Sequence, residues 1–382
     1  MILLVYGFKK LKEISYIGIS DLVGAGISSI FWLYLANLLG PESFGEINYI
    51  ISIANIGSTI ALLGATQTLL VYSAKKIKIH ATLYMLNLMI GIIIASVLTI
   101  LINDNFVGLL LIGYMIFAIA YSDLLGKKYF KNYSILIIFQ KILMVILVIG
   151  FNFIFGEEYI ILGIGLSLLI GVFSIINGFK ETKIDFQVLR NNLKFISFNY
   201  SNSIIGVIHG NIDKIIIAPV LGFVILGNYA LAIQILSLLL VFPVIIGKYL
   251  IPLESLGDEN LKLKKITIII SICLALIGSL SGPEILKVIF PKFLEIESII
   301  RIICLAIIPS TIALTYNAKL MAHEKGKPII IIGILRTGSF VLGIVTLGEY
   351  LHIEGIALSL IISESIGAIF SKILADRVKV EI

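Results

Sequence analysis

Charged side chains that interrupt long apolar stretches are the first candidates for chemistry in this 382-residue chain. A charge near the centre of a bilayer costs about 2.5–3.5 kcal/mol on insertion scales, so charges found there usually serve a function. The candidates are Asp21, Lys141, Asp213, Lys214, Arg301, Arg336 and Glu364.

The depth of each basic residue within its apolar stretch separates these candidates. Lys141 follows Lys131 by ten residues, about 15 Å along a helix at ~1.5 Å per residue. At that depth the amine cannot easily reach the membrane surface by snorkelling. Arg336 lies about 12 Å inside its own stretch by the same rise. Arg301 has Glu297 four residues earlier, and a salt bridge at the membrane edge explains that pair equally well.

Polar residues at helical spacing form three stripes. One follows steps of 3, 4, 3 and 4 residues along Asn199, Asn202, Gly206, His209 and Asp213. The other two consist of Asn48, Ser52, Asn55, Thr59 and Thr66, and of Asp21, Gly24 and Ser28. In lipid such stripes must face protein or water. They either line a wet cleft or pack against neighbouring helices, as Gly206-x-x-x-Gly210 would allow.

The acidic candidates could couple transport to an ion gradient. Asp21, Asp213 and Glu364 are the residues we assign to a proton or sodium gradient, and we expect no other cofactor and no metal site. Lys214 is about 100° round a helix from Asp213, so we do not expect the two simply to neutralise each other. His209 is more typical of an interhelical hydrogen-bonding partner than of a proton carrier.

The composition predicts that these residues lie in membrane helices. Hydrophobic residues make up 59% of the chain and charged residues only 14%, and the mean hydropathy is +1.09. A soluble domain carries nearer one quarter charged residues. A membrane span needs about 20 apolar residues. On that basis we expect twelve spans, at 14–39, 46–74, 81–102, 106–126, 132–155, 159–179, 194–221, 226–250, 266–282, 298–318, 328–347 and 353–374.

Every other connection between the expected spans is basic. Most of the 29 Lys and Arg residues lie on one side, whereas the opposite connections are mainly acidic. The positive-inside rule then places both termini in the cytoplasm of a multi-pass cell-membrane protein. No G-x-x-x-x-G-K-[ST] motif occurs to cradle a nucleotide phosphate, so we expect no nucleotide as partner. We also expect no nucleic acid as partner.

An internal repeat relates the two halves of the chain. Leu39-Gly40-x4-Gly45 recurs as Leu221-Gly222-x4-Gly227, and the same shift of 182 residues aligns Ala36 with Ala218. The repeat predicts an all-α membrane protein with two six-helix lobes related by an axis along the membrane normal. We place the lobes at 1–179 and 194–382, joined by a cytoplasmic connection at 180–193. Transporters built this way bind substrate between the halves, near the midplane.

Three segments resemble a known family. They are Ile212-Asp213-Lys214-Ile215-Ile216-Ile217 followed by Leu221-Gly222 and Leu226-Gly227-Asn228-Tyr229-Ala230-Leu231-Ala232, then Leu39-Gly40-Pro41-Glu42-Ser43-Phe44-Gly45, and finally Val288-Ile289-Phe290-Pro291-Lys292-Phe293 leading into Ile299-Ile300-Arg301-Ile302-Ile303. In order and spacing they resemble the signatures of polysaccharide (O-antigen-type) flippases of the multidrug/oligosaccharidyl-lipid/polysaccharide exporter superfamily. Pro291 stands where that family commonly has Gly. Twelve expected spans, rather than fourteen, argue against the role of the peptidoglycan lipid II flippases.

The resemblance implies two lobes around a central cavity lined by the first, second, seventh and eighth spans. It implies a polyprenyl-type pyrophosphate carrying an oligosaccharide as substrate, with membrane lipids as the other partners, and it implies a transporter rather than an enzyme. Basic residues would bind the phosphates and amides would bind sugar hydroxyls. The substrate-binding candidates are Lys141, Arg336, Arg301, Lys214, Asn55 and Asn202.

Two other functions stay open from the sequence. A multidrug or organic-cation antiporter of the same superfamily would use an acidic cavity, with Asp21, Asp213 and Glu364 as its main residues. Four cations against three carboxylates inside the spans favour an anionic substrate instead. A membrane-embedded glycosyltransferase would need a cluster of Asp, Glu or His in a long outer loop, and every expected outer loop is short. We therefore expect no enzymatic activity.

Overall fold

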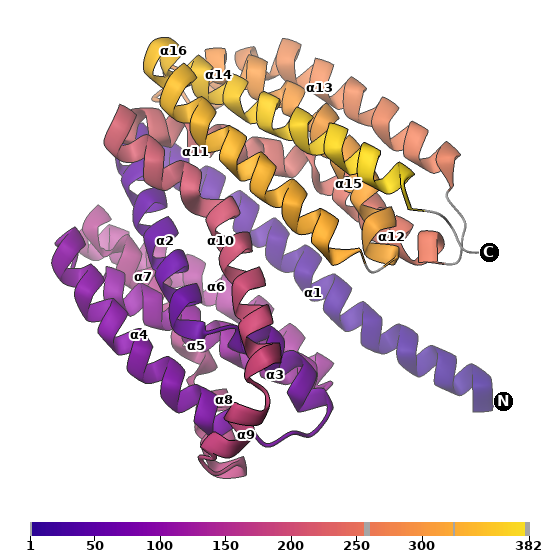
Figure 1. Ribbon diagram of the computed structural model, residues 1–382. Coiled ribbons are helices and arrows are strands. Elements are labelled where there is room, and N and C mark those ends of the chain that lie inside the picture. The colour runs from indigo at the N-terminus through magenta and orange to yellow at the C-terminus, as the bar shows by residue number, and fades with distance from the viewer. Residues whose placement is uncertain (1, 256–259, 324, 379–382) are drawn as a thin grey trace. The chain divides into compact units, whose positions relative to one another are not determined.

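The computed structural model describes residues 2–255, 260–323 and 325–378, with side chains from Tyr16 onward except at position 252. Both chain ends and the predicted cytoplasmic connection 254–265 lie partly outside these ranges. Within them the chain is almost entirely helical and contains no strand (Figure 1). The helices of the first half are α1 (Ile2–Leu39), α2 (Pro41–Leu62), α3 (Ala65–Ala74), α4 (His80–Ile102), α5 (Val107–Gly126), α6 (Phe130–Phe155), α7 (Ile160–Leu168), α8 (Val172–Glu181) and α9 (Phe186–Asn191).

The second half begins with α10, and it contains one broken long helix. Its helices are α10 (Leu193–Leu221), α11 (Phe223–Leu239), α12 (Val241–Ser255), α13 (Leu261–Ile289), α14 (Ile296–Ile303), α15 (Ile307–Ala322) and α16 (Gly326–Asp376). The 51 residues of α16 are interrupted at His352, whose backbone is not helical (φ 49°, ψ −125°). Because a span needs only about 20 residues, α16 is long enough to cross the membrane twice.

The number of spans agrees with the sequence. Among the described residues nine helices are long and apolar enough to cross a membrane, and α2 with α3 and α11 with α12 form two further spans bent by 49°. Counting the two parts of α16 separately raises the number to twelve. The bend between α2 and α3 occurs at Gly64, whose φ of +76° is the left-handed conformation that glycine adopts without strain. An all-helical membrane fold is thus confirmed.

The chain divides into two compact units. The first consists of Met1–Phe31 and Ile50–Asn211, and the second of Trp32–Tyr49 and Ile212–Ile382. In the first unit α5 packs against α3, α4, α6, α7 and α8. Glycine allows this close packing, because a Cβ at Gly113 would lie 2.8 Å from the carbonyl oxygen of Gly165. In the second unit α15 packs along α16 and also contacts α12 and α13. The predicted lobe boundaries at 179 and 194 stay a prediction.

The two copies of the sequence repeat pack on each other inside the second unit. A Cβ added to Gly45 would collide with the carbonyl oxygen of Phe223, and one added to Gly227 would collide with that of Pro41. Position 223 is 41 shifted by 182, and 227 is 45 shifted by 182, so the contact is reciprocal. Gly40 and Gly222 also share a positive φ, +84° and +90°. The repeat is therefore present in the structure as well as in the sequence.

Candidate functional site

A polar cavity lies within the first unit, between α2, α5 and α10. Its volume is about 330 Å³. The polar residues that line it are Asn55, Ser58 and Thr59 of α2, Thr66 of α3, Tyr114 and Tyr121 of α5, and Ser203 of α10. Gly206 of α10 contributes backbone to the same wall. The polar stripe of the second span and part of the seventh therefore meet at one cavity.

The hydrogen bonds within this wall leave acceptors and one amide facing the cavity. The hydroxyls of Ser58 and Thr59 donate to the carbonyl oxygen of Asn55, at 2.8 and 3.0 Å. Their oxygens can still accept further bonds. The side-chain amide of Asn55 makes no hydrogen bond within the part of the chain that the structure describes. The cavity can thus both donate to and accept from a ligand rich in hydroxyl groups.

The seventh-span stripe serves two purposes along its length. Near its start, the amide of buried Asn199 donates to the hydroxyl of Thr68 on α3 at 3.3 Å. Close helix packing continues there, since a Cβ at Gly64 would lie 2.6 Å from the backbone nitrogen of Tyr200. Asn202 is exposed on α10, and Gly206 lines the cavity. Interhelical packing therefore explains the beginning of the stripe, and a cavity explains the middle.

Lys141 is a cation without an acidic partner. It lies half-buried on α6 and makes no ion pair or side-chain hydrogen bond among the described residues. Its Cγ packs against α1, where a Cβ at Gly24 would lie 3.8 Å away. One turn earlier on α1, Asp21 accepts a hydrogen bond of 2.9 Å from the hydroxyl of Tyr133. The stripe of α1 thus packs on α6 beside the deeply placed lysine.

Arg336 and Glu364 form an ion pair in the second unit, although the sequence suggested different roles for them. The hydroxyl of Ser310 donates to the second carboxylate oxygen of Glu364 at 2.9 Å. Gly367 leaves room for the arginine, because a Cβ there would lie against the Arg336 side chain. Both charged groups are largely shielded, with side-chain exposures of 21% and 9%. Neighbouring residues thus fix the positions of both the carboxylate and the guanidinium group.

Asp213 and Lys214 also pair, which corrects the expectation that they would not neutralise each other. The amine of Lys214 lies 3.5 Å from one oxygen of Asp213. The hydroxyl of Tyr229 donates to the other oxygen at 2.7 Å. The angle between neighbouring Cβ atoms does not prevent the pair, because the flexible four-carbon stem of lysine lets the amine fold back.

Arg301 pairs with Glu297 at 2.9 Å, with both side chains exposed. This is the membrane-edge salt bridge that the spacing allowed. Three of the four basic candidates therefore have a carboxylate, and Lys141 alone lacks one in the described part of the chain. The excess of cations that favoured an anionic substrate is correspondingly smaller than the sequence suggested.

A buried polar cluster that sequence reasoning missed joins α3, α4 and α5. The hydroxyl of Ser73 donates to Asp123 at 2.8 Å, and Nε2 of His80 lies 3.1 Å from the same oxygen. Lys127 bridges the other oxygen of Asp123 (2.9 Å) to Glu181 (2.6 Å). The one readable signal was the i, i+4 spacing of Asp123 and Lys127. Partial burial alone would lower the pKa of Lys127, but hydrogen bonds to the two carboxylates and their charge raise it above its ordinary value.

The second unit carries a corresponding cluster. Glu254 at the end of α12 pairs with Lys264 at the start of α13, and both are buried. The amine of Lys264 also lies 5.5 Å from the ring centroid of Tyr316 on α15. Glu254 and Lys264 lie at the end of one helix and the start of the next, as Ser73 and His80 do in the first unit. Each cluster therefore joins several helices of its own unit, and Glu181 of α8 belongs to the first cluster as well.

Comparison with known proteins agrees with this architecture. An uncharacterised membrane protein of Methanocaldococcus jannaschii is 26% identical over 353 residues, covering 82% of this chain and 84% of the relative. The fold is similar to that of the lipid II flippase MurJ in an inward closed conformation, with a TM-score of 0.73 at 16% identity, covering 97% of this chain and 88% of that one.

A multidrug resistance MATE family transporter of the MOP superfamily, in its inward-facing conformation, is also similar. Its TM-score is 0.69 at 13% identity, covering 95% of this chain and 98% of that one. At such identities these two structures establish the fold. The model of the family described as polysaccharide biosynthesis protein matches residues 10–256, more than half of the 382 residues. The chain therefore belongs to this polysaccharide biosynthesis protein family.

Proposed function

We propose that this protein moves a lipid-linked oligosaccharide or polysaccharide precursor, carried on a polyprenyl or dolichyl pyrophosphate, from the cytoplasmic to the outer leaflet. Membership of the polysaccharide biosynthesis protein family and the fold shared with a lipid II flippase support this substrate class. The observation that carries the proposal is Lys141, a deeply placed cation without an acidic partner among the described residues. A charge within a membrane helix raises the free energy of the protein unless an anion binds to it.

The chemistry of the headgroup fits the residues available. A pyrophosphate with attached sugars cannot cross ~30 Å of hydrocarbon unaided. Lys141 would donate charge-assisted hydrogen bonds to a phosphate oxygen. Asn55, Thr59 and Thr66, which line the polar cavity of the first unit, would bind sugar hydroxyls. Asn202, exposed on α10, is a further candidate for sugar binding.

Arg336, Lys214 and Arg301 take second place as phosphate ligands. Each already holds a carboxylate, so each would have to leave that partner before it met the substrate. Removal of an opposite charge from a shielded pair is costly. In the substrate-free state Arg336 and Lys214 therefore serve mainly to neutralise Glu364 and Asp213, whereas Arg301 is held only by an exposed salt bridge.

We further propose that transport proceeds by alternating access and that the three acidic candidates couple it to an ion gradient. Each accepts a hydrogen bond from a hydroxyl: Tyr133 donates to Asp21, Tyr229 to Asp213 and Ser310 to Glu364. A hydroxyl can also accept a bond from a protonated carboxyl. Asp21 differs from the other two, because Asp213 pairs with Lys214 and Glu364 pairs with Arg336.

Flipping by Lys141 variants tests the proposal. Proteoliposomes would carry a fluorescent lipid-linked oligosaccharide, and a membrane-impermeant quencher would report its appearance in the outer leaflet. We expect Lys141→Ala to slow flipping about tenfold or more, because a hydrogen bond to a charged group contributes ~1.5–3 kcal/mol. Lys141→Arg should retain much of the rate. Lys128→Ala removes an exposed charge outside the spans and should leave the rate unchanged.

The antiporter of the same superfamily predicts the opposite pattern. If the unaltered protein flips no lipid-linked oligosaccharide but exports a fluorescent organic cation, and Asp21→Asn abolishes that export, the substrate is cationic and the flippase proposal is wrong. Normal flipping by Lys141→Ala would instead remove Lys141 from the substrate site. The fold is shared with a multidrug resistance transporter, so this arm belongs in the same experiment.

A further inference from the structure

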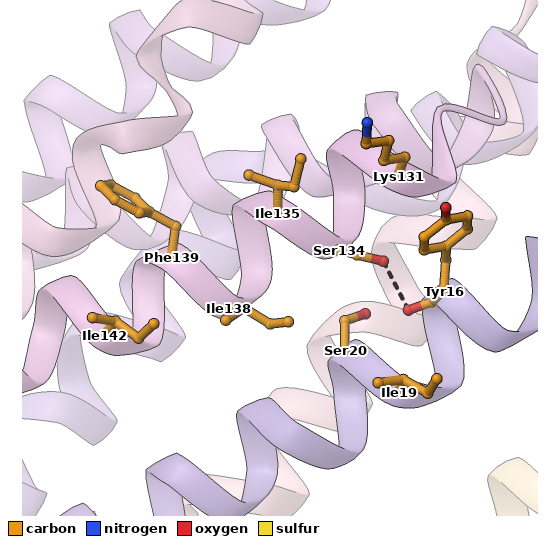
Figure 2. Close-up of a pocket in the computed structure, with 9 residues that line it drawn as sticks. All are labelled: Tyr16, Ile19, Ser20, Lys131, Ser134, Ile135, Ile138, Phe139 and Ile142. Atoms are coloured by element: carbon orange, nitrogen blue, oxygen red, sulfur yellow. Dashed lines mark hydrogen bonds between the residues drawn. The ribbon is translucent and has the colours of Figure 1, made fainter.

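A second, largely apolar groove lies between α1 and α6, on the first unit. Its volume is about 590 Å³. Apolar side chains form most of its wall: Ile19 of α1, and Ile135, Ile138, Phe139 and Ile142 of α6. The polar residues Tyr16, Ser20, Lys131 and Ser134 complete it. Figure 2 shows Lys131 and Tyr16 at one end of the groove and Phe139 and Ile142 at the other.

Two of the four polar side chains of the groove are already bonded within the protein. The hydroxyl of Ser134 donates to the carbonyl oxygen of Tyr16 at 2.7 Å, and that of Ser20 donates to Ile17 at 3.0 Å. The amine of Lys131 and the phenol of Tyr16 make no ion pair or side-chain hydrogen bond within the described residues. A ligand in the groove would therefore meet a cation and a hydroxyl at one end and only hydrocarbon beyond them.

The length of the groove matches one leaflet of a membrane. Its residues on α6 follow a single helical stripe from Lys131 to Ile142, with steps of three and four. The eleven steps from Lys131 to Ile142 rise about 16 Å at ~1.5 Å per residue. Half of a ~30 Å hydrocarbon core is about 15 Å. Lys131 stands in the first turn of α6, at the end that the charge pattern predicts to be cytoplasmic.

We propose that this groove binds one anionic phospholipid of the cytoplasmic leaflet. Its phosphate lies at Lys131 and Tyr16, and one acyl chain lies along Ile135, Ile138 and Ile142. The charge favours this occupant, because the cytoplasmic leaflet is rich in anionic lipids and each nearby lysine attracts them. A zwitterionic choline headgroup would bring a positive charge towards the unpaired amine instead. The bound chain would fill the space beside the few polar contacts that join α1 to α6.

Lipid titration followed by native mass spectrometry tests this site. The whole protein in detergent would be titrated with dioleoyl phosphatidylglycerol and, separately, with dioleoyl phosphatidylcholine. We expect one phosphatidylglycerol to bind more tightly than any phosphatidylcholine. Lys131→Ala should weaken that binding about fivefold, the effect of one lysine near a membrane surface. Lys131→Arg should restore it, and Lys128→Ala, an equally exposed charge outside the groove, should not weaken it.

A second pair of variants tests the hydrocarbon part. Ile138→Trp fills the groove and should reduce binding. Ile146→Trp, on the same helix with 61% of its side chain exposed but outside the groove, should not. Equal losses in Lys131→Ala and Lys128→Ala, or equal affinity for both lipids, would overturn the proposal. Displacement of phosphatidylglycerol by a lower concentration of decaprenyl phosphate would also overturn it, because the groove would then belong to an isoprenoid lipid.

The lipid site and the proposed transport function can fail separately. Lys141 does not line the groove, so Lys141→Ala should keep the phosphatidylglycerol affinity of the unaltered protein even where flipping is lost. Should Ile138→Trp fail to fold, the Lys131→Ala, Lys131→Arg and Lys128→Ala comparison still decides, because all three substitutions lie on the exposed end of the groove or beside it.

Discussion

For individual charged residues, the sequence predicts where in the chain they lie but not which partners they have. Their placement inside apolar stretches was evident from the sequence alone, and so was the isolation of Lys141 from any acid nearby in the chain. Their partners were not. Arg336 and Glu364 are 28 residues apart, and only the fold of the two parts of α16 brings them together. A linear sequence carries no signal for a pair that forms between two spans.

The Arg336–Glu364 pair leads to a prediction about stability. Among the described residues, Arg336→Met leaves the shielded carboxylate of Glu364 with the Ser310 hydroxyl as its single hydrogen-bond donor, which should cost about 3–5 kcal/mol. Adding Glu364→Gln removes the uncompensated charge and should recover most of the loss. Denaturant unfolding of the purified protein measures both effects.

Flipping by the same double variant then assigns the role of Arg336. If the stable double variant flips lipid, the arginine serves chiefly to neutralise Glu364. A stable but inactive double variant would show that the guanidinium itself meets the substrate. If Arg336→Met is as stable as the unaltered protein, Arg336 does not stabilise the fold by neutralising Glu364.

Helices as elements were more predictable than their breaks. The spacing of polar residues correctly grouped Asn55, Thr59 and Thr66 on one face of the second span, and the structure brings Gly206 to the same cavity. The interruption at His352 lies in the connection expected between the spans 328–347 and 353–374, although the non-helical backbone of that one residue had no signal in the sequence. The sequence also does not predict the apolar groove between α1 and α6, because its isoleucines cannot be told from those of any lipid-facing helix surface.

The crossing of α2 and α11 leads to a prediction about packing. Gly45→Ala and Gly227→Ala each place a methyl group against a backbone carbonyl, which cannot move as a side chain can. We expect each to lower the unfolding temperature clearly. Gly150→Ala is the matched control, because nothing lies within 4 Å of the added Cβ in α6. Alanine favours a helix over glycine by about 1 kcal/mol, so this control should be neutral or slightly stabilising. Equal effects at all three positions would mean that the crossing is loose.

At the scale of the whole molecule, the positive-inside rule predicts an orientation with both termini in the cytoplasm. Single cysteines at Glu158 and Glu349, both exposed, should react from outside intact cells with a membrane-impermeant thiol reagent. A cysteine at Lys183, in the predicted cytoplasmic connection, should react only after permeabilisation. Cys273 and Cys304 would be replaced first. Labelling of the Lys183 position in intact cells would reverse the topology.

The reciprocal glycine contact also has a consequence for how the protein is made. Residues 32–49 emerge early from the ribosome, yet they belong to a compact unit whose remaining residues begin at 212. Gly45 cannot make its packing contact until Phe223 and Gly227 have been translated, about 180 residues later. At ~5–20 residues per second this delay is roughly 10–35 s. During that time the nascent tip, including Phe44, has not met the core in which it is finally buried. Insertion of this chain is thus a problem of timing, in which an early hairpin must remain unpaired in the membrane until its counterpart arrives.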